Sequence, residues 1–597
     1  MVNKKVRKET HINNIYAVKL MASISSRRLL FMVVDSFLGY FEWLFMEVFF
    51  VKLLVSGIEE KQLFHEFLAF LLWSSIVFCV IMFLKSYYCS CVVPQTDIKI
   101  EKELYSVLYK KARNVELACY EKPDFYSKYT MAMDDAAKRL VNAVNTIINI
   151  FWGMLASVIA MIVIFYIEPF SCIFVAFPLI GNFVMGKLMN KVYYGRYVDD
   201  VRNARVMQYV NRVMHLKEYS KEMRYSGIYS VLMQKFKRAL KKKVEVMRKY
   251  GRKGMLYMSI KNILTFPIPF EGVMTFAVFQ TIIAKSMQLS DLAVIYSTMA
   301  TTSWILIGVF NDVVEYTKHS INIGYLRGFL EYKEKIPENL SGKPVLGEIN
   351  SIEFCEVSFG YNENEIIHKL SFQITKNQTV ALVGCNGAGK STIIKLLLRL
   401  YDPTSGKILV NGTDIRDYDL QEYRKLFSVT FQDYKIMGMS IRDNISMGDK
   451  VDDVEMSNVI HEVGLAYKIK EMKRGMETTM TKEFDDKGVV LSGGEQQKII
   501  LARAFVKKAA IQIFDEPSSA LDPLSEHDMY QKILCKPTNG IKILISHRLS
   551  TVKDVDKVIL IDNKTLHDEG KHEQLLARCR LYKQMYNSQA KKYMAID

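Results

Sequence analysis

A glycine-rich loop is the first stretch whose residue types point to chemistry. Residues 384–391 read GCNGAGKS, matching G-x-x-x-x-G-K-[ST], between an apolar run, TVALVG, and a helix-like run, STIIKLLLRL. Glycines let the backbone curl so that its N–H groups point at phosphate oxygens. The positive end of the following helix adds to that field. We predict a phosphate site formed by Gly384, Asn386, Gly387, Ala388, Gly389, Lys390, Ser391 and Thr392.

A second stretch supplies acids. The apolar run IQIFDE, at 511–516, ends in Asp515 and Glu516. Asp515 can orient Mg²⁺ through water, Ser391 can offer the ion its hydroxyl, and Glu516 can activate an attacking water as general base. Acidic strand ends are common, so this interpretation depends on the glycine-rich loop and on the motifs LSGGE, at 491–495, and ISHR, at 545–548.

With these motifs in order, residues 350–580 resemble the ATP-binding domain of an ABC transporter. The resemblance implies ATP and Mg²⁺ as cofactors and assigns roles residue by residue. Tyr361 stacks on adenine, Gln432 in TFQDY contacts Mg²⁺ and the membrane domain, and His547 touches the γ-phosphate. Glu516, His547 and Gln432 would form the catalytic set. The remaining contacts would come from the LSGGE motif and the SSALD loop at 518–522, through Ser492, Gly493, Gly494, Glu495 and Asp522.

The same resemblance implies a dimer. In this family the LSGGE motif binds the γ-phosphate of ATP held by the other ATPase domain, so one copy cannot complete a site. Because Glu516, His547 and LSGGE all match the functional pattern, a homodimer is favoured, and a separately encoded, related half-transporter remains the alternative.

The elements that position these motifs include a long apolar region. Six stretches are long enough to cross a bilayer, which takes about 20 residues each. They lie near 29–55, 63–86, 141–167, 170–190, 256–284 and 290–316. Peptide groups in lipid must be hydrogen-bonded within the segment, so we expect helices.

Charge sets the expected orientation. The long link 191–253 holds 18 Lys/Arg against 5 Asp/Glu, whereas the short links hold at most one lysine each. Positive segments stay on the cytoplasmic side, so the N-terminus, the long links and the ATPase domain are predicted to lie inside. This topology explains the formal charge of +17 more simply than nucleic-acid binding does, and we expect no nucleic-acid partner.

These observations predict two parts. The first is a membrane α-helical domain of exporter type, with six transmembrane helices and long cytosolic extensions, over 1–335. A linker follows at 336–349, and then an α/β P-loop ATPase domain at 350–597. Residues 125–136 and 221–227 resemble the family's two coupling segments. Pro267 and Pro269 mark either a gating hinge or a static kink in the fifth membrane helix.

Acids within the apolar stretches suggest what is carried. Asp35, Glu42 and Glu271 lie where charge is costly and tends to face a cavity or a partner. They predict an acidic cavity for a cationic or zwitterionic cargo such as a peptide; the alternative is pairing within the protein, for example with Lys261. The expected function is ATP-driven export of a peptide or other amphipathic solute, in contact with membrane lipid. A flippase for lipid or lipid-linked sugar is the alternative. Compact loops favour a bacterial plasma membrane.

Overall fold

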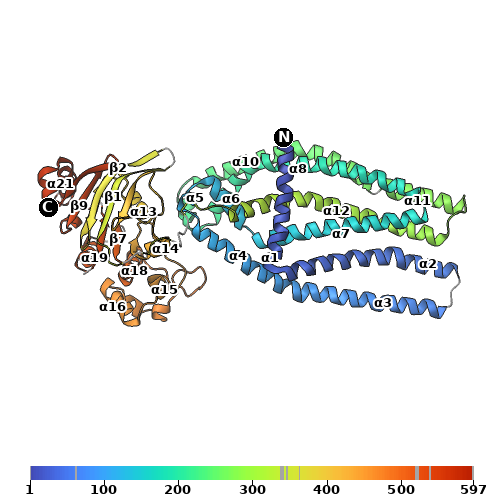
Figure 1. Cartoon of the computed structure of the whole chain (residues 1–597), viewed down its shortest axis with the longest axis horizontal. Coiled ribbons are helices and arrows are strands. Elements are labelled where there is room, and N and C mark those ends of the chain that lie inside the picture. Colours follow the sequence, from blue (N-terminus) through green and yellow to red (C-terminus); the bar gives the residue numbers. More distant parts are fainter. Residues whose placement is uncertain are drawn as a thin grey trace. The chain divides into compact units, whose positions relative to one another are not determined.

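The protein divides into two compact units in a computed structural model, Met1–Arg113 with Pro123–Lys333, and Asn114–Lys122 with Glu334–Asp597. Each unit is described here by itself (Figure 1). The structure describes residues 2–60, 64–265, 267–336, 342–344, 347–361, 364–517, 523–536, 539–546 and 548–594. The second unit thus contains a short segment, Asn114–Lys122, taken from within the helical part of the sequence.

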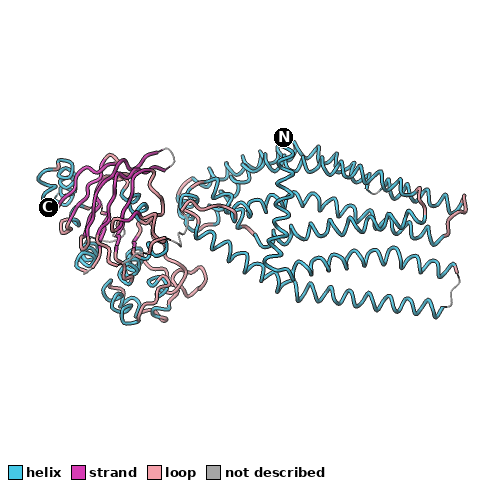
Figure 2. Tube along the Cα trace, viewed as in Figure 1, coloured by secondary structure: helices cyan, strands magenta, loops and turns pink. Residues whose placement is uncertain are grey.

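In its described residues, the first unit consists of helices joined by short loops (Figure 2). Its elements are α1 (Val2–Leu44), η1 (Phe45–Phe50), α2 (Val51–Glu59), α3 (Phe64–Tyr87), η2 (Tyr88–Val92), α4 (Val93–Asn114), α6 (Pro123–Met133), α7 (Ala136–Ile167), α8 (Ser171–His215), η3 (Lys217–Tyr219), α9 (Ser220–Tyr225), α10 (Ile228–Thr265), α11 (Pro267–Ile282) and α12 (Leu289–Leu330).

Each of the six predicted spans overlaps described helices, which are α1 to α2, α3, α7, α8, α10 with α11, and α12. Within the described residues, four helical stretches are long and apolar enough to cross a membrane: Phe64–Asn114, Ala136–Ile167, Ile228–Ile282 and Leu289–Leu330. The long links are helical as predicted, because α8 runs on to His215 and α10 begins at Ile228.

The centre of the helical unit is formed by α7 and α12, with α1 packed against both, while α8 lies along α10. Small residues permit the closest approach. A Cβ on Gly153 of α7 would stand 2.4 Å from Val309 of α12 and 2.9 Å from the Tyr40 hydroxyl of α1. Glycine at this crossing therefore sets the spacing of three helices.

Two features interrupt the regular helices. Ser25 inside α1 has extended backbone angles (φ −153°, ψ 85°), which bends that helix. The proposed hinge lies where α10 ends at Thr265 and α11 begins at Pro267, and Phe266 between them is outside the described residues. The hinge interpretation remains a prediction.

The second unit contains two sheets (Figure 2). An antiparallel sheet has the order β2-β1-β4-β5, and a larger one has the order β10-β9-β3-β8-β7-β6. In the larger sheet β9, β3, β8, β7 and β6 are parallel and β10 is antiparallel. The strands are β1 (Ser351–Tyr361), β2 (Asn364–Thr375), β3 (Thr379–Gly384), β4 (Ser405–Val410), β5 (Thr413–Asp414), β6 (Phe427–Thr430), β7 (Ile511–Asp515), β8 (Ile541–Ile545), β9 (Lys557–Asp562) and β10 (Thr565–Gly570).

Helices cover this sheet and complete the α/β fold that the sequence predicted. They are α5 (Leu117–Glu121), α13 (Lys390–Leu397), α14 (Leu420–Lys425), α15 (Ile441–Ser446), α16 (Asp453–Val463), α17 (Ala466–Lys470), η4 (Gly475–Glu477), α18 (Gly493–Val506), α19 (Pro523–Cys535), η5 (Leu549–Val552), α20 (His572–Arg578) and α21 (Arg580–Met594). Strands β3, β7 and β8 are almost fully buried, as expected for parallel strands covered on both faces.

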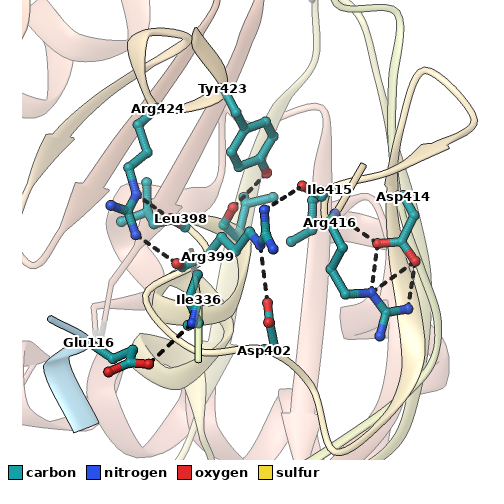
Figure 3. A network of polar contacts seen from close by, with 11 residues as sticks. Glu116, Ile336, Leu398, Arg399, Asp402, Asp414, Ile415, Arg416, Tyr423 and Arg424 are labelled. Atoms are coloured by element: carbon teal, nitrogen blue, oxygen red, sulfur yellow. Dashed lines mark hydrogen bonds and ion pairs between the residues drawn. The ribbon is translucent and has the colours of Figure 1, made fainter. Parts of the chain in front are cut away.

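The segment Asn114–Lys122 is held by the core of the second unit. Leu117 and Ala118 pack against the cluster that includes Phe359 and Ala388. A Glu116 carboxylate oxygen accepts a hydrogen bond from the backbone N–H of Ile336, 3.2 Å away (Figure 3). Residues 125–136, which resemble a coupling segment, lie in α6 and the start of α7 in the helical unit, and their coupling role stays a prediction.

Candidate functional site: a phosphate loop at the edge of a parallel sheet

The glycine-rich loop joins β3 to α13. Gly387 and Gly389 have φ of +80° and +98°, a left-handed conformation that side chains with a Cβ rarely adopt. Gly384 is needed for a different reason, because a Cβ there would lie 2.3 Å from the carbonyl oxygen of Ile561 in β9. The loop therefore has the curled backbone that phosphate binding requires.

Lys390 folds back over this loop. Its Nζ donates to the carbonyl oxygens of Gly384 (2.9 Å) and Cys385 (3.0 Å), and the residue is 5% exposed. Burial lowers the pKa of Lys390, while the charges of Glu516 and Asp515 oppose that shift. The ammonium group of Lys390 thus lies against the loop backbone, where it can exchange its two carbonyl partners for phosphate oxygens.

The two acids follow β7 and have different environments. Asp515 is 4% exposed, and its Oδ1 has no hydrogen-bond partner. Burial raises the pKa of Asp515 to about 6, and the Ser391 hydroxyl, which hydrogen-bonds to the carboxylate, opposes the rise. A buried carboxylate oxygen without a partner is costly, so it fits a cation that arrives with the ligand.

Glu516 is half-buried and has a left-handed backbone, with φ of +47°. Its N–H donates to the carbonyl oxygen of Ile545 at the end of β8 (3.1 Å). Its Oε2 accepts a hydrogen bond from Nε2 of Gln432, 2.8 Å away. The structure therefore brings together the two side chains that the sequence placed 84 residues apart.

Sheet order explains this convergence. The loop follows β3, Asp515 and Glu516 end β7, and Gln432 follows β6, while β8 lies between β3 and β7. Ligands of open α/β sheets bind outside the carboxyl ends of the strands. His547, predicted after β8, and Asp522 lie outside the described residues.

The LSGGE motif begins the 14-residue helix α18. Ser492 is the N-cap: its Oγ accepts from the Glu495 N–H, and the Glu495 carboxylate accepts from the Ser492 N–H at 2.8 Å. That backbone N–H lowers the pKa of Glu495. Ser492 and Gly493 are exposed, so the N-terminus of this helix is open to an anion.

Tyr361 ends β1 inside an aromatic group that the sequence did not indicate. Its ring centroid lies 5.1 Å from that of Phe359 and 5.3 Å from that of Tyr401, and Lys395 Nζ is 5.5 Å from its centroid. Tyr401 and Lys395 belong to none of the motifs, so only the folded structure shows that they pack against Tyr361.

The acids predicted to form a cargo cavity have unlike surroundings. Glu42 of α1 pairs with Lys85 of α3, with Oε2 and Nζ 3.3 Å apart. Asp35 is half-buried, whereas Glu271 on α11 is exposed. Lys261, the basic partner first considered, is 4% exposed and donates to Oδ1 of Asn311 at 3.2 Å. Of the two alternatives, cargo cavity and pairing within the protein, Glu42 fits the pairing.

Comparisons with known proteins agree with this geometry. The family profile described as ABC transporter matches residues 367–519, which include the phosphate loop, Gln432, Asp515 and Glu516. The fold is similar to the structure of a bacterial Atm1-family ABC exporter with ATP bound. That match has a TM-score of 0.79 at 21% identity and covers 94% of this chain and 98% of the other. The chain contains the ATPase domain of the ABC transporter family, and the proteins that it resembles are ABC exporters. The chain is an integral membrane protein that hydrolyses ATP to drive transport.

The curated relatives of this chain differ in what their names say they carry. The subtilin transport ATP-binding protein SpaT of Bacillus subtilis is 28% identical over 507 residues, 83% of this chain and 80% of its own. The mitochondrial iron–sulfur clusters transporter ATM1 of Saccharomyces cerevisiae is 39% identical over 244 residues, 40% of this chain and 35% of its own. An ATP-dependent lipid A-core flippase of Haemophilus ducreyi is 31% identical over 349 residues, which are 57% of this chain and 59% of its own length.

Proposed function

We propose that this transporter exports a peptide or other amphipathic solute by alternating access, as a dimer of two identical chains. The observation that carries the proposal is the meeting of the phosphate loop with Glu516 and Gln432 at one sheet edge, in a chain that also holds long apolar helices. The membrane is a bacterial plasma membrane, with the ATPase unit in the cytoplasm.

The residues at this edge have distinct roles. Backbone N–H groups of the loop cradle the phosphates, and Lys390 exchanges its carbonyl partners for phosphate oxygens. Glu516 accepts a proton from the attacking water, and Gln432 holds the carboxylate in place through the 2.8 Å hydrogen bond. His547 and Tyr361 contact the γ-phosphate and the adenine base.

Mg²⁺ fits the donor set that the structure provides. Ser391, Gln432 and Asp515 would hold the ion, and the unpartnered Oδ1 of Asp515 is the oxygen that lacks another role. When bound, Mg²⁺ would neutralise charge on the β- and γ-phosphates.

The dimer follows from the LSGGE helix. Its exposed N-terminus binds the γ-phosphate of ATP that is held by the phosphate loop of the second copy. Asp522 belongs to the same interface. ATP then favours the closed dimer because only that state completes both phosphate shells, and hydrolysis releases it. A related half-transporter in place of the second copy is the alternative.

For the cargo, a peptide is favoured by the relative named as a subtilin transport ATP-binding protein, which is matched over 80% of its length. The lipid A-core flippases among the relatives support the second candidate, a lipid or lipid-linked sugar flippase. Asp35 and Glu271 remain candidate contacts for a cationic peptide, and Glu42 joins them only if its pair with Lys85 opens.

One experiment separates the two candidates. The purified protein in nanodiscs is assayed for ATPase stimulation by a panel of cationic peptides and by a panel of lipids and lipid-linked sugars. Peptide export predicts stimulation by peptides. The acidic cavity further predicts that this stimulation is reduced in the double variant Asp35→Asn, Glu271→Gln, which leaves the pair of Glu42 with Lys85 intact. Stimulation by the lipid panel alone would refute peptide export, and an unchanged response of the double variant would refute the acidic cavity.

A further inference from the structure

The Tyr361 ring is held from several sides. The Tyr401 ring meets it edge-on, with an interplanar angle of 90°, and the Phe359 ring meets it at 84°. Lys395 Nζ lies over both tyrosines, 5.5 Å from the centroid of Tyr361 and 5.9 Å from that of Tyr401. Edge-to-face rings and a cation over a ring face are favourable arrangements. The orientation of Tyr361 therefore depends on where Tyr401 and Lys395 are placed.

Glu121 places both of them. Its Oε2 accepts a hydrogen bond from the Tyr401 hydroxyl, and its Oε1 lies 3.5 Å from Lys395 Nζ. Burial raises the pKa of Tyr401, and the hydrogen bond to Glu121 raises it further, so the hydroxyl keeps its proton and donates. One carboxylate at the end of α5 thus holds the two side chains that pack on Tyr361.

The backbone of Leu398 and Arg399, just before Tyr401 in the chain, is anchored by a side chain of α14 (Figure 3). The Tyr423 hydroxyl donates to the carbonyl oxygen of Leu397 at 2.6 Å. Arg424 donates to the carbonyl oxygens of Leu398, at 3.3 Å, and Arg399, at 2.7 Å. Because this backbone is anchored independently of α5, a change at Glu121 alters the side chains that contact Tyr361 and leaves the backbone in place.

We propose that Glu121 is a positioning residue for the adenine base of ATP, acting through Lys395 and Tyr401 on the ring of Tyr361. The inference rests on the proposed function, in which Tyr361 stacks on adenine. Glu121 belongs to α5, which the chain joins directly to α4 and α6 of the helical unit. The affinity for the base therefore depends on a segment that the membrane-embedded part of the chain carries.

The test compares a ligand that has the base with one that lacks it. For the full-length protein in nanodiscs, KM and kcat are measured for ATP, and Ki is measured for inorganic tripolyphosphate as a competitive inhibitor. Glu121→Ala is expected to raise the KM for ATP about threefold, the size typical of a partly exposed ion pair and hydrogen bond. The Ki of tripolyphosphate and kcat stay unchanged. Glu121→Gln, which keeps an acceptor for Tyr401, gives a smaller rise.

Glu116→Ala is the matched control. This acid lies in the same segment, but it hydrogen-bonds to the backbone N–H groups of Lys335 and Ile336. Its loss therefore weakens the attachment of the segment Asn114–Lys122 and leaves the contacts of the Tyr361 and Tyr401 rings in place. It is expected to leave the ratio of KM for ATP to Ki for tripolyphosphate unchanged.

Two results overturn the inference. One is an equal rise of KM and Ki in Glu121→Ala, which indicates a general structural effect, and the other is no change in KM. Tyr361→Ala separates this from the proposed function. If that variant leaves KM unaltered, the adenine role of Tyr361 itself fails. If it raises KM, adding Glu121→Ala must then have no further effect, because Glu121 acts on the base only through the ring of Tyr361 and residues in one chain of contacts are not additive.

Discussion

Replacing Glu516 by glutamine isolates its acid–base chemistry from its structural contacts. The Glu516 carboxylate accepts a hydrogen bond from Nε2 of Gln432, at 2.8 Å, and the backbone N–H of Glu516 donates to the carbonyl oxygen of Ile545. A glutamine oxygen accepts the same bond, and its backbone can keep the same left-handed φ. We therefore expect the free energy of unfolding to change by less than about 0.5 kcal/mol.

The loss of a general base is expected to lower kcat by about 10²- to 10⁴-fold, which raises the barrier by about 3 to 5 kcal/mol. The assay is phosphate release at saturating ATP, together with binding of radiolabelled ATP after rapid filtration. Binding should persist, because the phosphate loop is untouched. Asp433→Asn is the control: this exposed acid also acts electrostatically on Asp515, and its loss should change kcat less than about twofold. Turnover above a tenth of the original rate in Glu516→Gln would refute the role of Glu516.

Three further predictions concern stability. Gly384→Ala places a Cβ 2.3 Å from the Ile561 carbonyl oxygen, so the free energy of unfolding should fall by about 1 to 3 kcal/mol. Thermal unfolding with and without ATP should also show weaker stabilisation by ATP. An unchanged melting temperature would contradict the close approach. Burial lowers the pKa of His572, so as pH falls below about 6.5 the unfolded chain takes up the proton first and the native state loses stability. Between pH 8 and 5.5 the melting temperature should therefore fall less with pH in His572→Gln than in the original protein. An equal fall in both proteins would contradict this role of His572. Lys85→Ala leaves the carboxylate of Glu42 without its partner, so it should lower the melting temperature in detergent more than the double variant with Glu42→Gln does; equal losses would show that the pair contributes little.

The chemistry of the ATP site could be predicted from the sequence because its signals are local. The loop needs glycine at Gly387 and Gly389 for backbone conformations that few other residues adopt, and it must stand between a strand and a helix. Each condition is visible within about 20 residues. The hydrogen bond between Gln432 and Glu516 is not visible in this way, because it depends on β6 lying beside β7 in the folded sheet.

The docking of α5 could not be predicted in this way. Glu121 and Tyr401 are 280 positions apart, and neither belongs to a motif. The hydrophobic periodicity of the region indicates only helix, and five residues, Leu117–Glu121, are too few to show a pattern of their own. The sequence singled out 125–136, by its resemblance to a coupling segment, and gave no signal that Asn114–Lys122 belongs to the same compact unit as the ATP site.

Acids in apolar surroundings show what structure adds to a composition argument. In the sequence, Asp515 and Glu42 are alike, since each is a carboxylate next to apolar residues. In the fold, Glu42 is neutralised by Lys85, whereas Oδ1 of Asp515 is buried without a partner. A carboxylate kept in that state costs stability unless a cation binds to it. The charge of Asp515 is therefore compensated only when a ligand with its cation binds, whereas the charge of Glu42 is already compensated by Lys85 of α3.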